Sequence, residues 1–171
     1  MSAGARALVI VASHHHGSTE KVARAFASAL GADVRHPGEI ESEALRDYDA
    51  RHHEELLRLA EALPQAQGRK AFIFSTDGMP IALAGKSMVA ANSASSHAEL
   101  RARLVSAGYE IVGEFGCAGF NTNSFLRFFG GINKGRPNDE DIEDAEEFAK
   151  SLGREGEPSG SSPEKRKSLV G

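Results

Sequence analysis

Residues 7–30 read ALVIVASHHHGSTEKVARAFASAL, and this stretch decides the fold class. It opens with an apolar run rich in β-branched side chains, which is typical of a strand buried on both faces of a parallel sheet. A polar turn containing a glycine follows, and Val22, Phe26 and Leu30 then recur on one face of a helix. Because residues 32–36 read as a short edge strand, the sequence predicts a β-α-β unit here.

The rest of the chain continues this alternation. Apolar runs predict strands at residues 70–75 and 110–115, the second running on to Cys117. Helical spacing predicts three further helices, at residues 52–63, 96–107 and 138–152, the second starting with a capping box at Ser96–Glu99. Residues 81–95 have weak periodicity and predict a long loop with at most one helical turn. These elements predict an α/β fold, a doubly wound open parallel sheet of four strands with helices on both faces.

Length and charge narrow the class of protein. The chain has 171 residues, which predicts a single domain at residues 1–152 and, from its Gly, Ser, Pro and charge content, a disordered tail at 153–171. The formal net charge of −4 argues against a general nucleic-acid binder. The single cysteine excludes an internal disulfide framework. Because the apolar run at residues 7–12 is far too short to cross a bilayer, we expect a cytoplasmic protein without a membrane partner.

The turn between the first strand and the first helix contains the residues that indicate a ligand. The amides at a helix N-terminus are unpaired and lie at the positive end of the helix dipole, so hydroxyl residues and a glycine there favour phosphate binding. This turn consists of Ser13, His14, His15, His16, Gly17, Ser18 and Thr19. It has neither the lysine of a nucleoside-triphosphate loop nor the G-x-G-x-x-G pattern of a dinucleotide site. A phosphate loop built from hydroxyls and amides is typical of flavin mononucleotide (FMN) sites.

At this point the sequence resembles a known family, the flavodoxins. Residues 7–30 look like the first strand, phosphate loop and first helix of that family. The stretch GRKAFIFSTDG (68–78) resembles its fourth strand and the loop that approaches the flavin ring. The stretches GYEIVGEFGCAGFNT (108–122) and GGINKGRPNDEDIEDAEEFAKSL (130–152) are similar to the end of single-domain members.

The resemblance implies a site and a function. FMN would bind non-covalently, with its phosphate on the loop from Ser13 to Thr19. Its isoalloxazine ring would lie beside Ser75, Thr76, Asp77 and Gly78. The protein would carry electrons between redox partner proteins, and none of its residues would act as an acid, a base, a nucleophile or a metal ligand.

One interval departs from the family pattern. The stretch from Gly38 to Arg69 spans 32 residues and contains no strand candidate, whereas the family places a helix, a strand and a helix there. A central strand and one wall of the flavin site would therefore be missing. If so, we expect residues 8–12 to pair directly with residues 71–75, because unpaired backbone groups in a core are costly.

Other interpretations of the same residues stay open. The chain could be a flavin-free binding or interaction module on this scaffold, or an FMN-dependent quinone or NAD(P)H oxidoreductase. The three consecutive histidines could suggest a metal site, but the side chains of consecutive residues in a turn rarely point at one ion. Cys117 is expected to be a small buried residue. The acidic helix after Asn138 is either a solvated face or a docking face for a basic redox partner.

Overall fold

The computed structural model describes residues 7–13, 17–40, 52–122, 126, 128 and 130–154. Within these ranges strands alternate with helices and both strand pairs are parallel, as the α/β prediction requires. The elements are, in chain order, β1 (Leu8–Ile10), α1 (Ser18–Leu30), β2 (Asp33–Arg35), the 3-10 turn η1 (Pro37–Glu39), α2 (His52–Ala62), β3 (Lys70–Asp77), α3 (Ile81–Ser96), α4 (Ala98–Ser106), β4 (Glu110–Ala118) and α5 (Asp139–Arg154).

The predicted β-α-β unit is formed by β1, α1 and β2. The two strands run parallel, and the amide of Val11 extends their ladder by donating to the carbonyl of Arg35 at 2.9 Å. α1 begins after Gly17 and ends at Gly31, both of which adopt the left-handed conformation that glycine tolerates best. The helix buries Val22 and its neighbours on the face that the apolar spacing predicts.

The four strands form two separate pairs, β1 with β2 and β3 with β4. The expected pairing of residues 8–12 with residues 71–75 is therefore wrong. α1 joins the pairs through side chains instead: the ring of Phe26 lies 5.0 Å from the ring centroids of both Phe72 and Phe74 on β3, and it shares a buried cluster with Val9 of β1. A backbone ladder needs strands about 4.8 Å apart, whereas packing on a shared helix makes no such demand.

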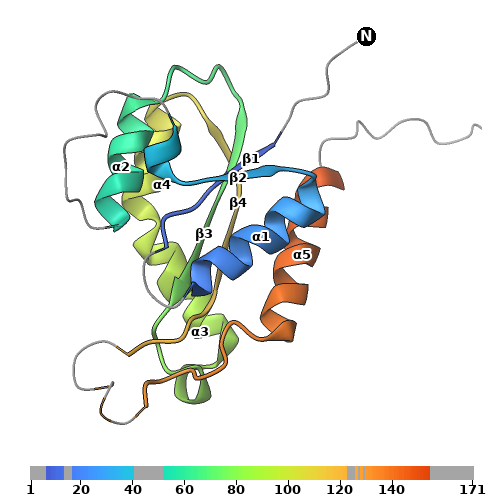
Figure 1. Cartoon of the computed structure of the whole chain (residues 1–171). Coiled ribbons are helices and arrows are strands. Elements are labelled where there is room, and N and C mark those ends of the chain that lie inside the picture. Colours follow the sequence, from blue (N-terminus) through green and yellow to red (C-terminus); the bar gives the residue numbers. More distant parts are fainter. Residues whose placement is uncertain are drawn as a thin grey trace, which may run out of the picture.

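Helices cover the strands on both faces, as predicted (Figure 1). α1 and α5 lie together on one face, where Phe26 is fully buried at the centre of the larger core cluster. α2 and α4 lie on the other face, where Ile73 of β3 packs against Ala60 and Leu104. α3 runs along β4. Successive side chains of β3 therefore point alternately to the two helical layers. This alternation decides the direction in which each site side chain points.

The prediction of a long loop at residues 81–95 is wrong, because α3 occupies this stretch. Its backbone leaves helical geometry at Gly85 (φ 75°, ψ 164°). Val89 and Ser93, four residues apart, are its buried residues, and Ser93 packs where Gly116 of β4 leaves room for it. A helix that is buried along so narrow a stripe has almost no apolar periodicity. The spacing of apolar residues therefore does not predict it.

The predicted capping box of α4 does not form. The helix has His97 as its N-cap residue, without a side-chain cap. The hydroxyl of Ser96 donates instead to the carbonyl of Asn92, at 3.1 Å, because α3 continues through this position.

The predicted start of α5 is confirmed. The Asn138 side-chain oxygen accepts from the amide of Asp141 at 3.1 Å, and the Asp141 carboxylate accepts from the amide of Asn138 at 2.9 Å. The helix ends at Arg154, slightly beyond the predicted boundary at residue 152. The rest of the predicted disordered tail lies outside the described residues.

Candidate functional site

The first turn of α1 lies at the carboxyl ends of β3 and β4. The hydroxyl of Thr19 is 2.8 Å from the hydroxyl of Thr76, the last but one residue of β3. The amide of Phe120, just after β4, donates to the hydroxyl of Ser18 at 3.3 Å. The structure thus brings together Ser18, Thr19 and Thr76, which the sequence predicted for one site. This is the strand edge at which open α/β sheets bind their ligands.

The first amides of α1 have no backbone partner within the described residues. The first hydrogen bond of the helix runs from the amide of Lys21 to the carbonyl of Gly17, at 3.0 Å. The amides of Ser18, Thr19 and Glu20 make no hydrogen bond within the described part of the chain. Because these donors lie at the positive end of the helix dipole, they suit an anion.

Glycine at position 119 lets the end of β4 approach this turn closely. A Cβ at Gly119 would lie 2.9 Å from the Cβ of Thr76 and 3.4 Å from the Cβ of Ser18. The Gly119 amide also donates to the carbonyl of Asp77 at 2.7 Å, which ties β4 to the end of β3. Gly119 is therefore part of the site, although the sequence analysis did not assign it. Its position inside the quoted 108–122 stretch is the signal that could have found it.

Asn133 connects the loops beside the site by hydrogen bonds, and the sequence analysis did not assign it either. It adopts a left-handed backbone (φ 56°). Its side-chain oxygen accepts from the amide of Ile81 at 3.1 Å, and its amide group donates to the carbonyls of Met79 and Gly119 at 2.7 and 3.1 Å. A single side chain thus links the loop after β3 with the loop after β4. An asparagine within a Gly/Asn-rich run is the only trace of this role in the sequence.

Ser75 lies on the opposite face of β3 from Thr76. Its hydroxyl is 2.9 Å from Nε2 of His97, whose Nδ1 is 3.0 Å from the carboxylate of Glu114 on β4. The Arg101 guanidinium of α4 donates to both oxygens of that carboxylate, from Nε to Oε1 and from Nη2 to Oε2, the latter at 2.7 Å. The hydrogen bonds of the Arg101 guanidinium hold the pKa of Glu114 below its ordinary value. The structure therefore separates Ser75 from the other residues predicted to bind the cofactor.

The remaining predicted residues lie around the turn between β3 and α3. The Asp77 carboxylate accepts from the amide of Met79 at 2.7 Å and from the side-chain amide of Asn92. Gly78 faces Asn121 so closely that a Cβ there would lie 2.3 Å from its side-chain nitrogen. Ser13 is described as irregular backbone after β1. His14, His15 and His16 lie outside the described residues, and the described ones contain no cluster of three metal-ligating side chains.

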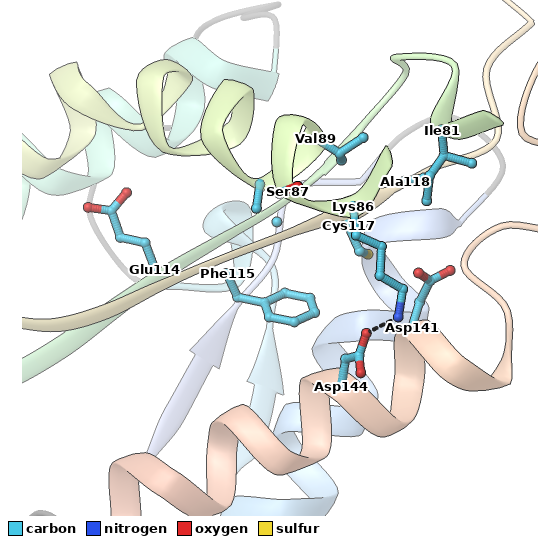
Figure 2. A pocket seen from close by; sticks show the side chains of 12 residues that line it. Ile81, Lys86, Ser87, Val89, Glu114, Phe115, Cys117, Ala118, Asp141 and Asp144 are labelled. Carbon is cyan, nitrogen blue, oxygen red and sulfur yellow. Dashed lines mark hydrogen bonds and ion pairs between the residues drawn. The ribbon is translucent and has the colours of Figure 1, made fainter. Parts of the chain in front are cut away.

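A separate cavity of about 280 Å³ lies between α3, β4 and α5 (Figure 2). The Lys86 ammonium reaches from α3 to Asp144 of α5 at 2.6 Å, and the hydrogen bond to that carboxylate is the main cause of the raised pKa of Lys86. Burial, with Asp141 nearby, raises the pKa of the Cys117 thiol to about 12. The prediction that Cys117 is a small buried residue is confirmed. None of the predicted cofactor residues that the structure describes lines this cavity.

Comparisons with known proteins identify one relative. No family model and no solved structure matches the chain. Among the helices of the described ranges, none combines the length and the apolarity that a membrane crossing requires. The chain is 38% identical over 157 residues to the uncharacterized protein MJ0298 of Methanocaldococcus jannaschii, an alignment that covers 86% of this chain and 97% of the relative. On this similarity, the chain belongs to the same family as the archaeal protein MJ0298.

Proposed function

We propose that this protein is a cytoplasmic, flavodoxin-like FMN-binding protein that transfers electrons between partner proteins. The observation that carries the proposal is the start of α1, whose first amides have no hydrogen bond within the described residues. The amides of Ser18, Thr19 and Glu20 offer donors to a phosphate, and the hydroxyls of Ser18, Thr19 and Thr76 lie beside them. The order of motifs along the chain, which resembles that of flavodoxins, supports FMN over other phosphorylated ligands.

The residues present fit the phosphate end of FMN well. Only one of the paired hydroxyls of Thr19 and Thr76 donates to the other, so the second keeps a proton for a phosphate oxygen. Glycine at position 119 avoids a side chain that would crowd Thr76 and Ser18. For the ring end, the backbone of Asp77 and Gly78 and the neighbouring Asn121 are the described groups that could contact an isoalloxazine. Ser75 is not among them, because its hydroxyl is bonded to His97.

Bound FMN would supply the redox chemistry, and the protein would supply binding and electrostatics. The acidic first turn of α5, with Asp139, Glu140 and Asp141, favours a partner with a basic surface. Asp141 is itself paired with Arg136 at 2.7 Å, and Glu140 is paired with Lys86 at 2.8 Å, so Asp139 is the carboxylate of this turn that has no ion pair within the described residues.

The direct experiment is flavin retention by the full chain. The protein is incubated with FMN, desalted, and examined for flavin absorbance and for quenching of flavin fluorescence. The proposal expects stoichiometric flavin that survives desalting. Loss of all flavin, with no quenching in the presence of excess FMN, would contradict it.

A second candidate is the flavin-free interaction module, which the division of the strands into two pairs favours. β3 has no ladder partner in the described residues other than β4, so one of its edges can pair with an extended segment of another protein. A protein that binds no FMN and whose β3 amides gain hydrogen-exchange protection in a complex would support this candidate.

A further inference from the structure

The side chains of Ser75, His97 and Glu114 are aligned in a continuous hydrogen-bonded row. Oγ of Ser75 is 2.9 Å from Nε2 of His97, and Nδ1 of His97 is 3.0 Å from Oε2 of Glu114. The three residues come from β3, the junction of α3 and α4, and β4. They are far apart in the sequence, and no motif links them. Their order is hydroxyl, imidazole and carboxylate, the arrangement that activates a serine nucleophile.

The chemistry of the three groups fixes which atom donates and which accepts in each hydrogen bond of the row. Glu114 is paired with the Arg101 guanidinium, which keeps the carboxylate ionised and able only to accept hydrogen bonds. In its neutral form, the imidazole of His97 therefore carries its proton on Nδ1, facing Glu114. Its Nε2 lone pair then faces Ser75, whose hydroxyl is the donor of that bond. His97 is 5% exposed, so the surrounding protein fixes the orientation of the ring.

The edge of β3 that faces away from β4 offers a substrate a backbone donor. The Gly119 amide donates to the carbonyl of Asp77, so the backbone of Asp77 faces β4. Because backbone groups alternate along a strand, the amide of Thr76 faces the other edge, which pairs with no strand in the described ranges. An amide of the residue that follows the nucleophile is a common donor to the oxyanion of acyl-transfer reactions. Ser75 itself is partly exposed.

We propose that Ser75 is a nucleophile for acyl transfer from carboxylic esters, with His97 as its general base and Glu114 as the positioning residue. The Ser75 oxygen would bond to the carbonyl carbon while its proton moves to Nε2 of His97. The carbon–oxygen bond to the alcohol would then break, and His97 would return the proton to the leaving alcohol. Water would hydrolyse the acyl-serine by the same route and restore Ser75. This site lies on the opposite face of β3 from Thr76 and does not depend on flavin binding.

The primary test is covalent labelling of the full chain with an alkyl fluorophosphonate. The Ser75 oxygen would displace fluoride from phosphorus, and the labelled peptide would be located by mass spectrometry. The proposal expects one label, on Ser75, that is absent in Ser75→Ala and unchanged in the matched control Ser106→Ala, an exposed serine on α4. A native chain that takes up no label at Ser75 would overturn the proposal.

A second measurement separates catalysis from structural bonding. Hydrolysis of p-nitrophenyl acetate and the labelling rate are compared in the native chain, in His97→Asn and in Glu114→Gln, with circular dichroism reporting the fold. Removal of a general base lowers such rates by about 10²–10⁴-fold. Both rates should fall by this factor in a folded His97→Asn protein. Equal rates in the native chain and either folded variant would show that the row is structural only and would overturn the proposal. If neither variant folds, the location of the label in the native chain decides.

Discussion

The hydroxyl of Thr19 lies 2.8 Å from the hydroxyl of Thr76, and this contact joins the two parts of the chain that the sequence marks as cofactor-binding. Thr19 lies in the first turn of α1, and Thr76, 57 positions later in the sequence, is the last but one residue of β3. The contact places the phosphate-binding turn and the β3–α3 turn at one edge of the molecule, where a single ligand can touch both.

Replacing Thr76 with Val should weaken FMN binding while leaving the fold intact. Valine keeps the β-branched shape that suits a strand but removes the hydroxyl beside Thr19. The loss of one partly buried hydrogen bond should lower the free energy of unfolding by about 0.5–1.5 kcal/mol. Urea denaturation and FMN titration measure the two effects, with Ser106→Ala as the control. An unchanged FMN affinity in Thr76→Val would remove this hydroxyl from the site.

Replacing Gly17 with Val should reduce FMN affinity more than it reduces stability. Gly17 has φ +63°, a conformation that costs a β-branched residue about 1–2 kcal/mol or more, and the new side chain would stand beside the α1 amides. Gly38→Val is the matched control, because Gly38 has an ordinary φ and open space around it. Calorimetric titration with FMN should separate the two variants. If both bind FMN equally well, the turn before α1 does not hold the phosphate.

Arg101→Met should make the protein less stable at neutral pH and change how stability depends on pH. Arg101 lowers the pKa of Glu114 in the folded state, so the ionised carboxylate stabilises the fold above its unfolded pKa. This contribution is lost as the pH falls through the lowered pKa of the folded state. The difference in unfolding free energy between the native chain and Arg101→Met should therefore shrink as the medium becomes acidic.

Arg103→Met is the control for this experiment, because Arg103 lies on the same helix and pairs with Glu99 and Glu61, which are 56% and 60% exposed. Denaturant unfolding at a series of pH values should show little pH-dependent difference for this variant. A difference for Arg101→Met that stays constant down to acid pH would mean that Glu114 is not the group concerned.

Cys117 should be unreactive in the folded protein. Burial raises the pKa of its thiol to about 12, so the thiolate is scarce at neutral pH. Raising the thiol pKa from 9.0 to about 12 lowers the thiolate fraction roughly 10³-fold, and burial blocks the reagent as well. Reaction with an aromatic disulfide should be fast in urea and slower by at least this factor without it. Rapid labelling of the native chain would place Cys117 on an accessible surface.

The strands and the first helix were predictable because their signals are local. The runs at residues 70–75 and 110–115 are apolar over their whole length, and strands buried in an α/β protein need that pattern. The Asn138 cap of α5 was predictable for the same reason, since the residues that complete it lie within one turn.

The directions of the site residues were not predictable in the same way. Ser75 and Thr76 are neighbours, and only the strand pleat sends one to His97 and the other to Thr19. The contacts of His97 with Glu114 depend on tertiary packing between α3, α4 and β4, for which the sequence carries no local signal. The division into two strand pairs is also a tertiary feature without a local signal, and Phe26 packs against residues of both pairs.

The most direct test of the phosphate site compares FMN with riboflavin, which has the same ring and no phosphate. Isothermal titration of the full chain should give an FMN dissociation constant at least about tenfold lower, since anion binding at the α1 amides and nearby hydroxyls is worth roughly 1.4 kcal/mol or more. Inorganic phosphate should bind weakly and compete with FMN. Equal affinities for FMN and riboflavin, with no competition by phosphate, would contradict the assignment of the turn at Gly17, Ser18 and Thr19 as a phosphate site.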